Sequence, residues 1–289
     1  MPAQIIDGKL FAKEYKEKLK NEIVQLKAKT GQIPHICNIM VGNPASAASY
    51  AISQKKIAAE VGMSYDLAEL PPETSQAQVI DYIHKLNTDP RINGIMIYKP
   101  LPPEIDYQTV ANQIDLDKDI EGVNLANIGK LLLGQPTLIP CTAEAAFELI
   151  QSTGTALRGK EAVVIGVSEI VGKPLFSLLL RERATVTVCH RGTLDAGQLS
   201  QHIGRADIVI AAIGRPQFVK GEWIKKGAVV IDVGINQVDN KIVGDVEFEP
   251  ALARAGYITP VPGGVGPVTV VMLMRNGIEA FKKQRGITA

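Results

Sequence analysis

The sequence predicts an α/β protein of two domains with a cleft between them. Two series of alternating helices and strands predict this fold class, together with a proline-rich segment that separates the series. The strands of both series are apolar on both faces, which is typical of parallel sheets covered by helices.

The first series extends to about residue 97. Apolar residues recur at helical spacing over 8–28, so a helix is expected there. The run 34–41 is short, apolar and ended by Gly42, as expected of a strand. The same alternation continues with helix 46–61, strand 64–69, helix 75–87 and strand 93–97.

The alternation stops between Tyr98 and Pro140. Five prolines and a group of acidic residues at 115–121 predict loops with short helices in this segment. Long ordered loops in compact domains often carry function, so the segment is a candidate wall of a substrate site.

The second series begins with helix 143–152. Its expected strands are 161–166, 185–189, 207–212 and 228–232. The last helix, 268–284, has one apolar face that needs a surface to pack against, so we expect it to return to the first domain. The expected domains are therefore 1–142, completed by 268–289, and 143–267.

Composition excludes several classes of protein. Thirty-one Lys and Arg against thirty Asp and Glu give a net charge of +1, so no overall field favours nucleic acid or an anionic membrane. No apolar run approaches the length of a membrane span and no signal peptide is evident, so a cytoplasmic protein is expected. Cys37, Cys141 and Cys189 lie in apolar segments without metal-ligand spacing, which predicts buried thiols and no metal site.

A glycine turn follows the first strand of the second series, where Gly166 and Gly172 flank the start of a helix. A pyrophosphate needs such a close backbone and the positive end of a helix. The spacing Gly-x-Ser-x-x-x-Gly is a weak signal by itself, because plain structural turns also use it. Gly214 and Gly234 follow later strands at the same edge of the sheet, which favours a Rossmann-like, nucleotide-binding domain.

Arg191 stands at the end of the next strand, directly after Cys189 and His190. An acid there would bind the ribose diol of NAD, whereas a cation can pair with the extra phosphate of NADP. NADP is therefore the expected cofactor, with NAD as an alternative. The alternative interpretations are a solvated loop cation for Arg191 and a packing residue for His190.

Several motifs follow one another along nearly the whole chain. They are Val41-Gly-Asn-Pro-Ala-Ser46 with Tyr50, Pro100-Leu-Pro102, Lys118-Asp-Ile-Glu-Gly122, Asp232-Val-Gly-Ile-Asn236, Gly244-Asp-Val246 and the glycine-rich run 260–267. In order and spacing they resemble the methylenetetrahydrofolate dehydrogenase/cyclohydrolase family. The resemblance implies an enzyme, usually a homodimer, that oxidises 5,10-methylenetetrahydrofolate with NAD(P) and hydrolyses the methenyl product to 10-formyltetrahydrofolate.

The resemblance also implies which residues form the sites. The catalytic residues would be Tyr50, Gln54, Tyr98 and Glu121. The folate would contact Pro100, Pro102, Pro262, Gly263 and Gly264. The cofactor would contact Gly166, Ser168, Ile170, Gly172, His190, Arg191, Ala212, Gly214, Gly234, Ile235 and Thr269.

The sequence departs from the family pattern at the sites themselves. Gln54 stands where the family has lysine, and Tyr98 stands where it has glutamine. Glu121 replaces an aspartate that resembles a pterin anchor, and Val167 replaces an arginine that binds the 2′-phosphate in many members.

These changes affect the two reactions differently. Hydride loss from the methylene carbon is driven by the neighbouring nitrogen lone pair, so the enzyme mainly aligns donor and acceptor. Hydrolysis of the methenyl cation needs a group that titrates near neutrality, and such catalysis contributes about 10²- to 10⁴-fold. An amide at Gln54 cannot supply it, and Lys55 and Lys56 point to other sides of the helix. We therefore expect a dehydrogenase with little or no cyclohydrolase activity.

Two other functions stay open on the sequence. Changes at Gln54, Tyr98 and Glu121 are also what a pocket for another imine or iminium substrate would show, with Tyr98 in the space of a folate ring. The third possibility is a non-catalytic, nucleotide-binding paralogue. The glycines kept together at the sheet edge speak against it.

Overall fold

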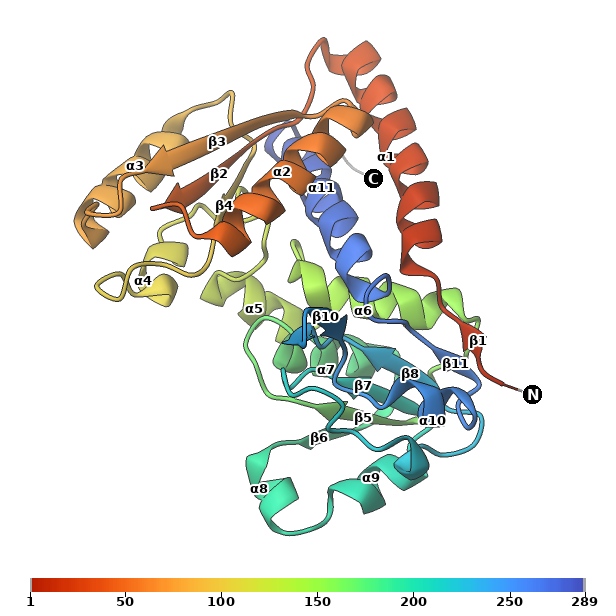
Figure 1. Ribbon diagram of the computed structural model, residues 1–289. Helices are drawn as coiled ribbons and strands as arrows, with labels where there is room; N and C mark the ends of the chain where they lie inside the picture. Colours follow the sequence, from red (N-terminus) through yellow and green to blue (C-terminus); the bar gives the residue numbers. More distant parts are fainter. Residues whose placement is uncertain (1, 288–289) are drawn as a thin grey trace. The chain divides into compact units, whose positions relative to one another are not determined.

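The computed structural model describes residues 2–287, apart from the side chain of Ser46. These residues form two compact units (Figure 1). The three-stranded unit comprises the described residues of 13–139 and 270–289, and the six-stranded unit those of 1–12 and 140–269.

The expected domain limits differ from this division at the amino end. Residues 1–12 are grouped with the six-stranded unit, because β1 (Gln4–Ile5) pairs in parallel with β11 (Tyr257–Ile258) at one edge of that sheet. Strands of two residues leave no periodic pattern in a sequence, so neither strand was expected.

The three-stranded unit is built on a parallel sheet of order β3-β2-β4. Its strands are β2 (His35–Val41), β3 (Ser64–Leu70) and β4 (Gly94–Ile97). Its helices are α1 (Gly8–Thr30), α2 (Ala45–Val61), α3 (Gln76–Thr88), α4 (Tyr107–Ala111), α5 (Leu125–Leu132) and α11 (Val265–Gln284). The first residues of α1 and α11 are grouped with the six-stranded unit.

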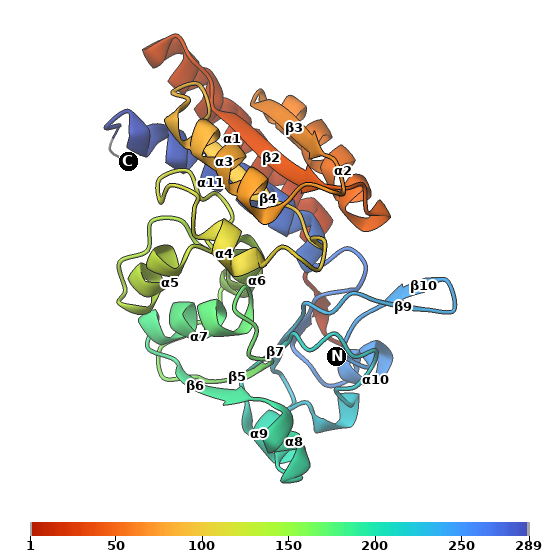
Figure 2. The ribbon, with the colours of Figure 1, turned by 90° about the vertical axis from the view of Figure 1, so that its left-hand side faces the viewer.

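Alternate residues of β2 face different helices, as the two-residue period of a strand requires. Ile39 packs with Val79 and Ile83 of α3, whereas Met40 packs with Ala51 of α2. Helices α2 and α3 accordingly lie on opposite sides of β2 (Figure 2). One face of the strand is thus wholly apolar, and the face toward α2 is available for other side chains.

The carboxyl-terminal helix α11 is anchored in the three-stranded unit by a buried asparagine. The amide of Asn276 donates to the carbonyls of Ile120 and Ile139, at 2.9 Å each. Gly277 lies against Ile36, where a Cβ would be 3.0 Å from the isoleucine methyl.

The six-stranded unit has a parallel sheet of order β1-β11-β8-β7-β5-β6. Besides β1 and β11, it contains β5 (Glu161–Ile165), β6 (Thr185–Cys189), β7 (Ile208–Ala211) and β8 (Val229–Asp232). Its other elements are α6 (Cys141–Ser152), α7 (Gly172–Arg181), α8 (Arg191–Asp195), α9 (Leu199–Arg205), the 3₁₀ helix η1 (Gly221–Trp223), α10 (Phe248–Leu252) and the hairpin of β9 (Asn236–Val238) and β10 (Lys241–Val243).

The apolar segments of the sequence form the cores of the two units. The three cysteines are free thiols and are buried, as expected from their segments. None of the helices within residues 2–287 is both long enough and apolar enough to cross a membrane.

Candidate active site

Tyr50 and Gln54 lie one turn apart on α2, but they differ in exposure. The Tyr50 side chain is 42% exposed, whereas Gln54 is only 3% exposed. Lys55 and Lys56 are both exposed, so the ammonium groups next to Gln54 in the sequence point away from its buried position. The periodicity of the helix therefore separates them from Gln54 in the way the sequence predicted.

Gln54 belongs to a buried cluster of amide and phenol groups, which we call the amide–tyrosine cluster: Asn38 of β2, Gln54 of α2, Tyr65 of β3 and Tyr98, which follows β4. The Asn38 amide donates to Gln54 Oε1 at 2.7 Å, and the Tyr98 hydroxyl donates to the same oxygen. The hydroxyls of Tyr65 and Tyr98 are 3.0 Å apart, and the Asn38 amide lies 3.3 Å from the Tyr98 hydroxyl. The four side chains are therefore bonded to one another inside the unit, and Asn38 Oδ1 is buried without a hydrogen-bond partner among the described residues.

The amide–tyrosine cluster is neutral. Burial raises the pKa of Tyr98, and burial together with the hydrogen bond to Tyr98 raises that of Tyr65. The nearest polar contact of the Gln54 amide nitrogen is Met96 Sδ, at 3.8 Å. None of the four side chains titrates near neutrality, so the cluster has no group that can exchange a proton readily with a ligand.

Tyr98 is 3% exposed and packs with Met40, Ala47 and Ala51. It therefore lies in the core of its unit, although the sequence suggested that it could fill the space of a ligand ring. Asn38 and Tyr65 were not expected at the site. An asparagine within the apolar run 34–41 was the available signal, because a buried amide needs a partner.

Glu121 lies in a turn two residues after Asp119, which forms an isolated β-bridge with Ile95 of β4. Its Oε2 accepts a hydrogen bond from the Tyr107 hydroxyl at 3.0 Å. Burial raises the pKa of Glu121 to about 7, and the charge of Asp119 adds to this rise, whereas the Tyr107 hydrogen bond and the Lys99 ammonium oppose it. The Lys99 ammonium lies 4.3 Å from the centre of the Tyr107 ring. Glu121 is thus a carboxyl group that changes its charge near neutral pH.

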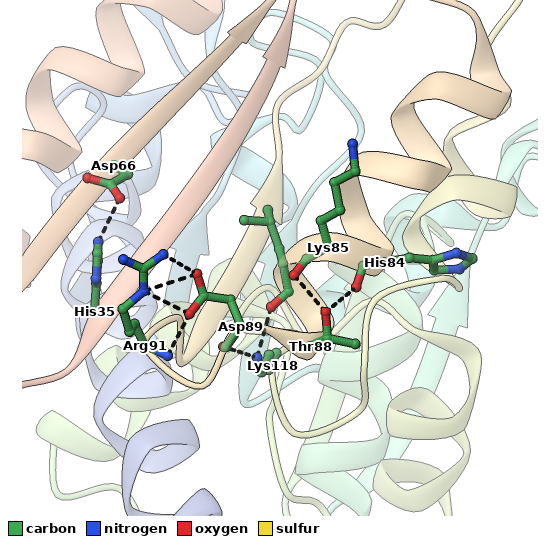
Figure 3. A network of polar contacts seen from close by, with 9 residues as sticks. His35, Asp66, His84, Lys85, Thr88, Asp89, Arg91 and Lys118 are labelled. Atoms are coloured by element: carbon green, nitrogen blue, oxygen red, sulfur yellow. Dashed lines mark hydrogen bonds and ion pairs between the residues drawn. The ribbon is translucent and has the colours of Figure 1, made fainter.

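Glu121 does not pair with Lys118, although their positions in the sequence allow it. The Lys118 ammonium instead donates to the carbonyls of Leu86 and Asp89, at 2.9 and 2.8 Å, at the end of α3 (Figure 3). Lys118 therefore fixes the loop that carries Glu121 and leaves the carboxyl group to other partners.

The neighbouring Asp119 is a structural residue. Its buried carboxylate accepts from the backbone amides of Gly122 and Asn124, at 3.1 and 2.9 Å, and from the Asn127 amide at 2.8 Å. These hydrogen bonds close the turn on both sides of Glu121 and determine where its side chain lies.

The glycine turn of the six-stranded unit lies between β5 and α7. Gly166 has φ +121°, and a Cβ there would collide with the carbonyl of Ala212. A Cβ at Gly172 would collide with the carbonyl of Gly166. Ser168 and Ile170 lie in the turn itself, where the Ser168 hydroxyl accepts from the Gly172 amide at 3.4 Å. The backbone thus comes close to the first turn of α7, as a bound pyrophosphate requires.

Two buried aspartates hold the loops that follow β7 and β8. Asp232 accepts from the amides of Gly234 and Val246, at 3.0 and 2.8 Å, and burial raises its pKa to about 6. Asp245 accepts from the amides of Ile213, Gly214 and Arg215, at 2.7, 3.0 and 2.9 Å. A Cβ at Gly234 would collide with the Asp245 carboxylate. Close packing within the protein therefore explains why Gly234 and Gly172 have no side chain, and these glycines do not by themselves indicate a nucleotide-binding site.

A cavity of about 380 Å³ opens at this edge of the sheet. Its lining includes Gly166, Val167, His190, Arg191, Ala212 and Arg215. His190 caps the amino end of α8, and its Nδ1 accepts from the Gly192 amide at 3.0 Å. Among residues 2–287, no acidic residue lines the cavity at the end of β6, so the cavity fits the phosphorylated adenosine of NADP better than the free diol of NAD.

The other expected contacts are distributed over both units. Pro100 and Pro102 follow β4 in the three-stranded unit, and Lys99–Pro100 is a cis peptide bond. The remaining residues lie in the six-stranded unit: Pro262, Gly263 and Gly264 before α11, Thr269 on α11, and Ile235 after β8, which is 60% exposed.

Comparison with known families gives a description for each half of the chain. Residues 6–121 match the catalytic domain of tetrahydrofolate dehydrogenase/cyclohydrolase, and residues 140–285 match its NAD(P)-binding domain. The chain belongs to this family. Its second half is therefore an NAD(P)-binding domain in a two-domain α/β fold with an amino-terminal catalytic domain.

This chain aligns with relatives of the same family over nearly its whole length. It is 45% identical to the bifunctional protein FolD of Moorella thermoacetica over 98% of this chain and 100% of that protein. It is 46% identical to the FolD of Acetivibrio thermocellus over 98% and 99% of the two chains. The Trypanosoma brucei FolD, solved with NADP and an inhibitor, superposes with a TM-score of 0.93 at 38% identity over 100% of both chains.

Proposed function

We propose that this family member is an NADP-dependent methylenetetrahydrofolate dehydrogenase whose cyclohydrolase activity is lost or strongly reduced. The family models that match both halves of the chain are described as tetrahydrofolate dehydrogenase/cyclohydrolase domains, which supports a folate substrate. The observation that carries the reduced hydrolysis is the buried, neutral environment of Gln54, whose oxygen is taken up by Asn38 and Tyr98.

The residues of the chain can support hydride transfer without a general acid or base at the reacting carbon. A bound nicotinamide supplies the hydride acceptor. Tyr50, half exposed on α2, offers a ring for the pterin, and the Glu121 carboxylate offers an acceptor for its amino group. The contribution of these residues is alignment, which is the main requirement of this step.

Hydrolysis of the methenyl product makes a different demand. Water must lose a proton and a ring nitrogen must gain one, so a residue that titrates near neutrality is needed at the reacting carbon. The amide–tyrosine cluster has no such residue. The Tyr98 ring lies in the core and does not project into a pocket. It therefore gives little reason to expect a pocket altered for another imine or iminium substrate.

The decisive experiment follows both reactions in one assay. Methylenetetrahydrofolate is oxidised with NADP, and the absorbance of the methenyl product is then followed. We expect rapid oxidation, so that the methenyl compound accumulates. Its subsequent decay should be no faster than its decay in buffer alone. Fast catalysed decay by the unmodified protein would contradict the proposal.

Variants at Gln54 sharpen this test. Gln54→Lys combined with Tyr98→Gln should accelerate methenyl decay by roughly 10²-fold or more, because a titrating amine then stands where the cluster was. Gln54→Met, of similar size and without charge, is the matched control and should leave the decay at the buffer rate. Binding of tetrahydrofolate by calorimetry tests the substrate class, and light scattering tests the expected homodimer.

A further inference from the structure

The cavity beside β5, β6 and β7 has an uneven distribution of charge. Its apolar part consists of side chains such as Leu194, Leu199 and Ile213. Its polar part carries His190, Arg191 and Arg215, and none of the described residues that line it is acidic. Such a lining suits a flat base next to an anionic group.

Arg215 is held in place by contacts that leave its charge available. Its backbone amide donates to Asp245 Oδ1 at 2.9 Å, which fixes the loop after β7. Its guanidinium lies 4.3 Å from the centre of the Phe218 ring, a stacking contact that orients the side chain. Among residues 2–287, no carboxylate forms an ion pair with Arg215.

Arg191, which is exposed like Arg215, differs from it in having an acidic partner. It is paired with Asp195 at 2.8 Å on α8, and its side chain is 79% exposed. Part of its charge is therefore already compensated. Val167, which also lines the cavity, has no charge where the family pattern has arginine.

We propose that Arg215 is a specificity-determining residue that binds the 2′-phosphate of NADP and supplies the cation that Val167 lacks. The planar guanidinium can donate two parallel hydrogen bonds to a phosphate. A charge-assisted contact of this kind typically contributes roughly 10- to 100-fold in affinity. The inference rests on the NAD(P)-binding domain and not on which folate reaction the protein catalyses.

Two nucleotide fragments test the proposal without any catalytic step. Calorimetry compares binding of 2′,5′-ADP, which carries the 2′-phosphate, with binding of 5′-AMP, which lacks it. Arg215→Met should weaken the affinity for 2′,5′-ADP by at least about tenfold and change the affinity for 5′-AMP by less than about twofold. Arg215→Lys keeps the charge without the planar fork and should give an intermediate loss.

The control is Arg158→Met, because Arg158 is exposed in the same unit and does not line the cavity. It should leave both fragments unaffected. Equal weakening of both fragments by Arg215→Met would overturn the proposal, because the side chain would then act on the base or on the fold. No weakening of 2′,5′-ADP would overturn it as well. Failure of the dehydrogenase assay would leave this binding difference intact, so the two proposals fail separately.

Discussion

Gln54 and Glu121 show how burial sets the chemistry of a single side chain. At both positions the family resemblance of the sequence led us to expect a different residue. Gln54 is enclosed by partners that use its oxygen, whereas Glu121 keeps one hydrogen bond, to Tyr107, and a raised pKa. A residue that looks like a conservative replacement in the sequence therefore gains a property, titration near neutrality, that comes from its surroundings.

Glu121 should make the fold less stable as pH rises. Its pKa is about 7 in the folded protein against an ordinary 4.5, so the folded state binds the proton more tightly. The free energy of unfolding therefore loses this contribution as pH rises from about 4.5 to 7. Glu121→Gln should remove this part of the pH dependence and raise the stability at pH 8 relative to the unmodified protein.

Urea unfolding of both proteins at pH 5 and pH 8 measures this difference. Glu104→Gln, at an exposed position of the same segment, is the control and should follow the unmodified protein. Parallel pH profiles for Glu121→Gln and the unmodified protein would show that burial of this carboxyl has no energetic consequence.

At the scale of the elements, buried carboxylates organise the loops at the ends of the strands. Asp119 closes the turn around Glu121 in one unit, and Asp232 and Asp245 hold the loops after β8 and β7 in the other. Each accepts several backbone amides that would otherwise be unpaired. The Asp-Val-Gly and Gly-Asp-Val motifs are thus explained by loop geometry.

Replacement of Asp245 should affect stability and nucleotide binding together. Asp245→Asn loses an acceptor for the amides of 213–215 and should lower the free energy of unfolding by roughly 1–3 kcal/mol. It should also weaken the binding of 2′,5′-ADP, because the backbone amide of Arg215 donates to the same carboxylate. Asp239→Asn, in the exposed turn of the β9–β10 hairpin, should change neither. Loss of stability with unchanged affinity for 2′,5′-ADP would show that the loop held by Asp245 does not contribute to nucleotide binding.

At the scale of the whole molecule, each unit is completed by a segment distant in the sequence. β1 joins the sheet of the six-stranded unit, and most of α11 joins the three-stranded unit. Asn276 makes the second connection specific, since it binds the carbonyl that directly precedes Glu121 in the chain.

Asn276→Ala should therefore destabilise the three-stranded unit. The carbonyls of Ile120 and Ile139 lose a donor, at a total cost of roughly 1–3 kcal/mol. Hydrogen exchange should become faster in residues 118–124 than in β5 and β7 of the other unit. Glu14→Ala, on the exposed face of α1, is the control and should stay within about 0.5 kcal/mol of the unmodified protein. Uniform acceleration of exchange in both units would contradict this local role.

The sequence by itself determined the α/β class, the order of the long elements and the family, because periodicity and motif spacing are properties of neighbouring residues. It also singled out the positions expected to depart from the family pattern, Gln54, Tyr98, Glu121 and Val167. Only the tertiary structure decided what these residues touch. Asn38, Tyr65 and Arg215 reach their places from different strands and loops, and burial and hydrogen-bond partners depend on contacts between segments that are far apart in the chain.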